Sequence, residues 1–145
     1  MKVVFDTNVL LVSISKKSKY RPIFDSVLNG TIDLLITNEI ISEYSEIIGR
    51  KTNEIVSNNI IEALLILPNV LKTEVYFKWK LITNDIDDNK FVDCYIGGNA
   101  DFLVTNDRHL NVLKNLDFPK LEIISIDDFL AIIESGLKSH EWTND

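Results

Sequence analysis

The sequence places acidic residues directly after short apolar runs at two distant points of the chain. Residues 3–5 run into Asp6. Residues 102–105 run into Asn106 and Asp107. A short, bounded apolar run is typical of a buried strand, and the carboxyl ends of parallel strands form the edge where ligands bind in open α/β folds. The repeated pattern therefore predicts that acids from distant parts of the chain meet at one edge of a sheet.

Strand and helix patterns alternate along the whole chain. Alternation of this kind predicts right-handed crossovers and a mainly parallel sheet that is covered on both faces. With 145 residues and 46% hydrophobic residues, the chain suits one domain. We therefore predict an α/β fold, a three-layer α/β/α sandwich over residues 1–138, followed by a frayed tail over 139–145. The predicted strands are 2–6, 33–37, 102–105 and 121–125, and residues 70–76 are predicted to be extended. The predicted helices are 8–15, 22–29, 38–49, 52–67, 89–97, 107–115 and 126–135, the last one capped by Gly136.

Composition excludes several classes of protein. Asp6 interrupts the first apolar run too early for a signal peptide, and no apolar stretch is long enough to span a membrane. The one cysteine, Cys94, excludes an internal disulfide, and we interpret it as core filler rather than as a nucleophile. These features predict a cytoplasmic protein.

The formal net charge of −7 argues against a protein that coats nucleic acid without specificity. An obvious cluster of basic residues occurs only between Lys16 and Arg21. The negative charge is compatible with a nuclease, because carboxylates that hold divalent cations make the metal-free enzyme acidic.

Two acids in the first part of the chain fall where a functional side chain is expected. Asp6 stands at a strand end, so it is either a turn or capping residue or a site acid. The small polar residues Thr7 and Asn8 favour the second interpretation. Glu43 follows Ile40 by three residues on or beside the apolar face of its helix, where an unpaired carboxylate is costly. A solvated position at the rim of this helix is the alternative for Glu43.

Further acids occur in the second half. Asp93 lies among apolar residues of the 89–97 helix, and Asp107 is either the N-cap of the next helix, a site acid or both. The loop acids Asp85, Asp87 and Asp88 are interpreted as turn and N-cap residues, with contact to a metal as the alternative.

Acids that gather at one sheet edge repel one another unless cations lie between them, and Mg²⁺ or Mn²⁺ prefers such oxygen ligands. Phosphodiester hydrolysis is a reaction that a site of this kind supports. Nucleotide-binding glycine motifs and a Gly-x-Ser-x-Gly motif are absent from the sequence. His109 and His140 do not form a zinc pattern with one cysteine, although His109 lies beside the predicted site.

Four motifs together resemble the PIN-domain family of metal-dependent ribonucleases, in the branch that includes VapC-like toxins of prokaryotic toxin–antitoxin pairs. The resemblance covers about residues 2–130, and each motif is short. The motifs are Val-Val-Phe-Asp-Thr-Asn at 3–8, Glu-Ile-Ile-Ser-Glu-Tyr at 39–44, Asp-Asn-Lys-Phe-Val-Asp at 88–93 and Ala-Asp-Phe-Leu-Val-Thr-Asn-Asp at 100–107.

The resemblance implies an acidic site that binds Mg²⁺ or Mn²⁺ and cleaves RNA. It also implies an antitoxin partner and a homodimer. One departure is Asp93, where many relatives carry the longer Glu. Carried over by position, the catalytic and metal-binding acids are Asp6, Glu43, Asp93 and Asp107, and the supporting polar residues are Asn8 and Thr105.

Two other functions remain open at this point. One is a catalytically degenerate PIN-like module that acts through protein association, which the acidic net charge favours. The other is a phosphohydrolase with Asp6 as nucleophile, which the sequence disfavours because Asn8 stands where a second Asp is usual.

Overall fold

Five parallel strands form one sheet in the order β3-β2-β1-β4-β5 in the computed structural model, which describes residues 1–82 and 86–143. The chain builds the sheet outward from β1 on one side and then crosses to the other side of β1. This reversal lies between β1 and β4, which is where α/β folds form their ligand crevice. The strands are β1 (Lys2–Phe5), β2 (Asp33–Ile36), β3 (Val70–Lys72), β4 (Phe102–Val104) and β5 (Ile123–Ile124).

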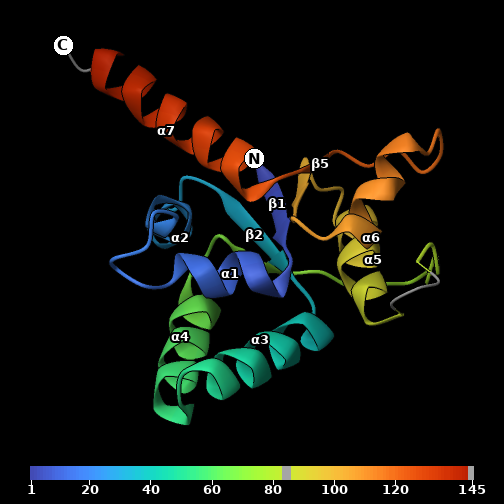
Figure 1. Ribbon diagram of the computed structural model, residues 1–145, viewed down its shortest axis with the longest axis horizontal. Helices are drawn as coiled ribbons and strands as arrows, with labels where there is room; N and C mark the ends of the chain where they lie inside the picture. The colour runs from blue at the N-terminus through green and yellow to red at the C-terminus, as the bar shows by residue number, and fades with distance from the viewer. Residues whose placement is uncertain (83–85, 144–145) are drawn as a thin grey trace.

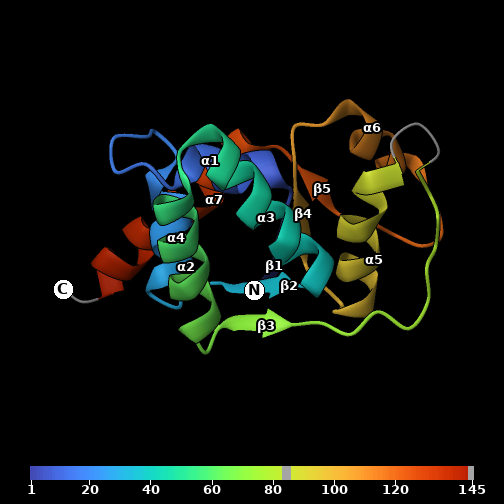
Figure 2. The same ribbon diagram turned by 90° about the horizontal axis from the view of Figure 1, so that it is seen from below.

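Helices cover both faces of this sheet, which confirms the predicted α/β sandwich (Figure 1). Helix α5 lies against one face, and α1, α2 and α7 lie on the other side (Figures 1 and 2). Helix α3 packs along α4 and reaches toward α5. The helices are α1 (Thr7–Ser13), α2 (Arg21–Leu28), α3 (Asn38–Lys51), α4 (Glu54–Ile66), α5 (Asn89–Gly97), α6 (Arg108–Asn111) and α7 (Ile126–Thr143), with 3₁₀ turns η1 (Ile86–Asp88) and η2 (Val112–Asn115).

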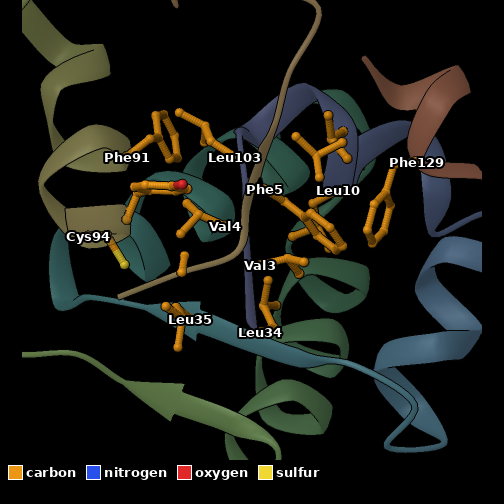
Figure 3. Packing of buried hydrophobic residues seen from close by; sticks show 14 of the residues in the cluster. Val3, Val4, Phe5, Leu10, Leu34, Leu35, Phe91, Cys94, Leu103 and Phe129 are labelled. Atoms are coloured by element: carbon orange, nitrogen blue, oxygen red, sulfur yellow. The ribbon is translucent and has the colours of Figure 1, made fainter. Parts of the chain in front are cut away.

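The core lies on both faces of the sheet because successive side chains of a strand point in opposite directions. In β1, Val4 points toward Phe91 of α5, whereas Phe5 points toward Phe129 of α7 (Figure 3). The rings of Phe5 and Phe129 meet edge to face with centroids 5.7 Å apart. Burial on both faces explains why the strands read as continuous apolar runs rather than as alternating ones.

Most element boundaries lie within two residues of the prediction, and larger differences occur at three places. The segment 70–76, which was predicted only to be extended, joins the sheet as strand β3. This strand ends at Lys72, because the neighbouring strand β2 ends at Ile36 and offers no further partner beyond the bond from the Thr73 N–H to the Ile36 carbonyl. The expected 107–115 helix divides into α6 and η2.

The third boundary is the end of α7, which runs past Gly136 to Thr143. A glycine ends a helix when it adopts a positive φ, and Gly136 does not. Residues 139–143, predicted as a frayed tail, are therefore helical, and residues 144–145 lie outside the described part of the chain. No helix among the described residues has the length and apolar character needed to cross a membrane.

One buried hydrogen bond fixes helix α3 to the end of β1, and it can be tested by stability. The Tyr44 hydroxyl, fully buried, donates to the Phe5 carbonyl at 2.5 Å, one residue before Asp6. Removing that hydroxyl in Tyr44→Phe leaves a buried carbonyl without this donor, so we expect the free energy of unfolding to fall by about 1–2 kcal/mol. Urea denaturation measures it. The control Tyr76→Phe alters a side chain that is 93% exposed, and an equal loss there would contradict the assignment.

Candidate functional site

The carboxyl ends of β1 and β4 bring Asp6 and Asp107 to the reversal point of the sheet. Thr105 follows β4 and joins the two acids. Its hydroxyl donates to the Asp6 carboxylate and accepts the Asp107 backbone N–H at 3.0 Å. Thr105 is fully buried, so this arrangement is held rigidly at the base of the site. The structure thus confirms that the two distant strand ends meet, as the sequence predicted.

Asp6 is both a helix cap and a buried acid. Its carboxylate accepts the Val9 N–H at 3.1 Å and so caps α1, while only 8% of the residue is exposed. Burial raises the pKa of Asp6, and the charge of Asp107 acts in the same direction. The Thr105 hydroxyl and the N–H groups of α1 oppose that rise in pKa. The capping and site interpretations of Asp6 are therefore compatible rather than exclusive.

Asp6 and Asp107 open into a common pocket of about 270 Å³. Asn8 and Asn106 also line it, so the pocket wall carries amide groups beside the two carboxylates. Asn106 additionally accepts the Ile126 N–H at 3.0 Å, which fixes the start of α7 next to the site. Asn8 was predicted as a polar support, and its place on the pocket wall is consistent with that.

Asp88 joins Asp107 from a distant part of the chain. Asp88, Asp107 and His109 each present one potential ligand atom, and these atoms all lie within 4.8 Å of one another. Asp107 also accepts the His109 N–H at 2.8 Å and so caps α6, while Asp88 stands at the N-cap position of α5. Asp6, Asp88 and Asp107 thus all precede helices. This shared position is the sequence signal that could have singled out Asp88.

Glu43 is held between α1 and α5. The Lys90 ammonium lies 2.8 Å from its carboxylate, and the Thr7 hydroxyl donates to it. Thr7 directly follows Asp6, and Lys90 lies two residues after Asp88. Both contacts therefore connect Glu43 to segments that carry the other acids. The expected cost of an acid beside an apolar face is thus offset by an ion pair and a hydrogen bond. Nothing in the sequence pattern identified Lys90 as this partner.

Asp93 faces a different and larger cavity. It is 6% exposed, accepts the Trp79 N–H at 3.0 Å, and lines a cavity of about 780 Å³ together with Glu39 and Lys78. Burial raises the pKa of Asp93, and the charge of Glu39 adds to the rise. Within residues 1–82 and 86–143, no hydrogen bond joins Asp93 to Asp6 or Asp107, and Asp93 is not close enough to these acids to bind one metal ion together with them.

The remaining loop acids fall into two groups. Asp87 lines the larger cavity with Asp93, whereas Asp85 lies outside the described residues. The structure therefore gathers Asp6, Asp88 and Asp107 around one edge, links Glu43 to them through Thr7, and sets Asp93 apart. Lys90, which lines the larger cavity, contacts Glu43, and Glu43 accepts the hydroxyl of Thr7, the residue after Asp6 of the smaller cavity.

Comparisons with known proteins agree with the α/β fold. A family model described as a PIN domain matches residues 2–109, a range that includes every acid considered above. The crystal structure of VapBC2 from Rickettsia felis bound to a DNA fragment from their promoter contains a similar chain, with a TM-score of 0.61 and 14% sequence identity. The match covers 86% of this chain and 98% of that chain, and at this identity it shows a shared fold. The search of curated proteins found no match.

Proposed function

Because this chain belongs to the PIN-domain family, we propose that it is a metal-dependent endoribonuclease that hydrolyses RNA phosphodiester bonds. The observation that carries the proposal is the convergence of acids from three segments at the reversal point of the sheet. Asp6 comes from the end of β1, Asp88 from the start of α5 and Asp107 from the loop after β4. Structural turns alone do not require acids of distant segments to converge.

The residues present fit a divalent cation. Asp88, Asp107 and His109 offer ligand atoms within 4.8 Å of one another, and carboxylate oxygens suit Mg²⁺ or Mn²⁺. A cation bound there supplies Lewis-acid stabilisation of phosphate charge. Asp88, Asp107 and His109 would hold the cation, while Thr105 keeps Asp107 beside Asp6. We propose Asp6, Glu43 and Asp107 as site acids. Asp88, just before α5, and Asp93, within α5, are two further candidates, of which the geometry favours Asp88.

Lys90 has a separate role in this proposal. Its ammonium lies 2.8 Å from Glu43 and is largely buried, so it offsets the charge of Glu43 when no cation is bound. In the substrate complex, the same ammonium is placed to attract a phosphate that approaches the acids. Asn8, on the pocket wall, offers a further polar contact for the substrate.

We extend the proposal to a toxin role. The similar fold in the VapBC2 complex supports it, because that chain belongs to a two-component assembly bound to promoter DNA. On this proposal the partner is an antitoxin protein, the chain forms a homodimer, and it acts on RNA in the cytoplasm.

One observation favours the second function, a degenerate PIN-like module that acts through protein association. The Lys90 ammonium already neutralises Glu43, so part of the acidic charge is compensated without a metal. The two functions differ in metal binding, because only the nuclease requires a cation at the acids.

Metal dependence separates these two functions. We expect the protein to cleave single-stranded RNA with Mg²⁺ or Mn²⁺, to lose cleavage in excess EDTA, and to regain it when Mg²⁺ is restored. Isothermal titration should detect Mn²⁺ binding. We expect Asp107→Asn to weaken the affinity for Mn²⁺ by about tenfold or more, because it changes a group that would hold the cation. The matched control Asp128→Asn alters an exposed acid of α7. A wild-type protein without Mn²⁺ heat would support the association module, and cleavage that persists in EDTA would contradict metal dependence.

A further inference from the structure

Residues 73–82 follow β3 and carry an interleaved aromatic and basic sequence. Residues 76–80 read Tyr-Phe-Lys-Trp-Lys. Figure 2 shows this segment, in light green, running from β3 along the outside of the molecule to α5. The sequence pattern predicted an extended segment only as far as residue 76 and no basic cluster here. Its composition resembles a surface for single-stranded nucleic acid, where basic side chains contact phosphates and aromatic rings stack on bases.

The segment is fastened although it forms no strand beyond Lys72. The Trp79 N–H bonds to Asp93 at 3.0 Å. Near its end, Ile82 and Asn89 exchange two hydrogen bonds, at 2.9 and 3.0 Å. These bonds hold the backbone of residues 73–82 against α5, which fixes the positions from which the side chains of this segment extend. They also give buried Asp93 a defined task as the acceptor that anchors Trp79.

The aromatic side chains of this segment form an exposed row with a second loop. The Phe77 and Trp79 rings have centroids 5.0 Å apart, and the Trp79 and Phe118 rings 5.8 Å apart, both edge to face. Tyr76 is 93%, Phe77 64% and Phe118 80% exposed. Several large exposed aromatic residues side by side mark a binding surface more often than a folding requirement.

The charge around these rings is positive in an otherwise acidic chain. From 72 to 80 there are three lysines, Lys72, Lys78 and Lys80, against one glutamate, Glu74, a net of +2 where the whole chain carries −7. The three lysines line the cavity of about 780 Å³ that also includes Lys90, the partner of Glu43. Glu39, Glu74, Asp87 and Asp93 line the same cavity, and the Lys78 ammonium lies 3.9 Å from Glu39. Lysines therefore extend from the aromatic row to the partner of Glu43, although acids lie among them.

We propose that the 76–80 segment and Phe118 bind the single-stranded RNA on which the site acts. Bases stack on the rings of Phe77 and Phe118, and phosphates contact Lys78 and Lys80, so the strand enters the cavity toward Lys90. The proposal rests on the proposed ribonuclease function, because it takes RNA as the substrate. The exposed rings favour unpaired bases, since stacking requires bases that are splayed out of a duplex.

Binding and cleavage are measured separately to test this. Fluorescence anisotropy with a labelled oligouridine is carried out with Mg²⁺ in the Asp6→Asn background, so that the RNA stays intact. We expect Phe77→Ala to weaken binding by about 5- to 150-fold, the range for loss of one stacked base, and Phe77→Tyr to retain it. The double change Lys78→Ala and Lys80→Ala should lower the slope of log affinity against log salt by roughly 1.4, which is about 0.7 for each phosphate contact.

Controls use exposed residues elsewhere in the chain. Ile66→Ala, at the end of α4, removes a side chain that is 81% exposed, and Lys17→Ala removes an exposed cation; both should leave binding unchanged. Unchanged affinity in Phe77→Ala would overturn the proposal and assign the rings to a protein interface instead. Equally tight binding of duplex RNA would also overturn it.

Failure of the RNA-binding surface and failure of the ribonuclease function give different results. If wild type binds the oligouridine through Phe77 and the lysines yet cleaves no RNA, the binding surface stands and the nuclease function falls. If wild type cleaves RNA while all segment variants bind and cleave normally, the nuclease stands and this surface falls.

Discussion

RNA cleavage by the Asp6→Asn variant is expected to fall by about a thousandfold or more. Asp6 is the acid that ends β1, shares a pocket with Asp107 and is fixed by Thr105, so its charge is needed where the cation and the phosphate meet. Asparagine keeps the shape and a carbonyl acceptor for the Val9 N–H, so the cap of α1 is retained. Initial rates with excess Mg²⁺ measure the loss. The exposed change Asp128→Asn should leave the rate unchanged.

Asp6→Asn should be more stable than the wild type, although it cleaves RNA more slowly. A carboxyl group whose pKa is higher in the folded than in the unfolded chain binds more protons when folded, so the free energy of unfolding falls as the pH rises from 3.8 through the folded pKa. Because burial raises the pKa of Asp6, its ionised form destabilises the metal-free protein at neutral pH. Asp6→Asn removes that charge, and we expect a gain of about 0.5–2 kcal/mol in EDTA.

Measuring both cleavage and stability of Asp6→Asn distinguishes the loss of a site acid from misfolding of the variant. A loss of cleavage together with lower thermal stability would indicate a folding defect, not a missing site acid. Cleavage at the wild-type rate by a folded Asp6→Asn protein would contradict the assignment of Asp6. Thermal unfolding of wild type and variant in the same buffer, with EDTA and with Mg²⁺, distinguishes these results.

The second large effect separates the two acids associated with α5. Asp88→Asn is expected to lower kcat by about a hundredfold or more, because Asp88 lies close enough to Asp107 and His109 for all three to bind one metal ion. Asp93→Asn should change kcat by less than about tenfold, because the amide oxygen can still accept the Trp79 N–H. Asp93→Ala removes that acceptor, so we expect a higher KM with little change in kcat.

Steady-state kinetics at several RNA concentrations measure both parameters. The Asn variants are matched, since each removes one charge without changing side-chain volume. Equal losses of kcat in Asp88→Asn and Asp93→Asn would place Asp93 at the reacting atoms, as the sequence alone predicted. A wild-type kcat in Asp88→Asn would exclude Asp88 from the site.

The fold and part of the site could be predicted from local patterns. Apolar runs bounded by polar residues marked the strands, and helical spacing marked α3, because burial on the faces of a sheet constrains each segment separately. Asp6 and Asp107 could be paired for the same reason, since each directly follows a strand and parallel strands end at one edge. The end of α7 could not be predicted, because Gly136 stops a helix only in a conformation that its sequence does not impose.

What the sequence alone determined is which segments are buried, in which direction the strands run, and hence which edge carries Asp6 and Asp107. Only the tertiary structure decided that Asp88 reaches Asp107, that Lys90 pairs with Glu43, and that Asp93 anchors Trp79. The physical reason is that burial patterns act within one element. The contacts of a charged side chain depend on how α5 is rotated and packed against its neighbours, which the tertiary packing of the whole chain fixes.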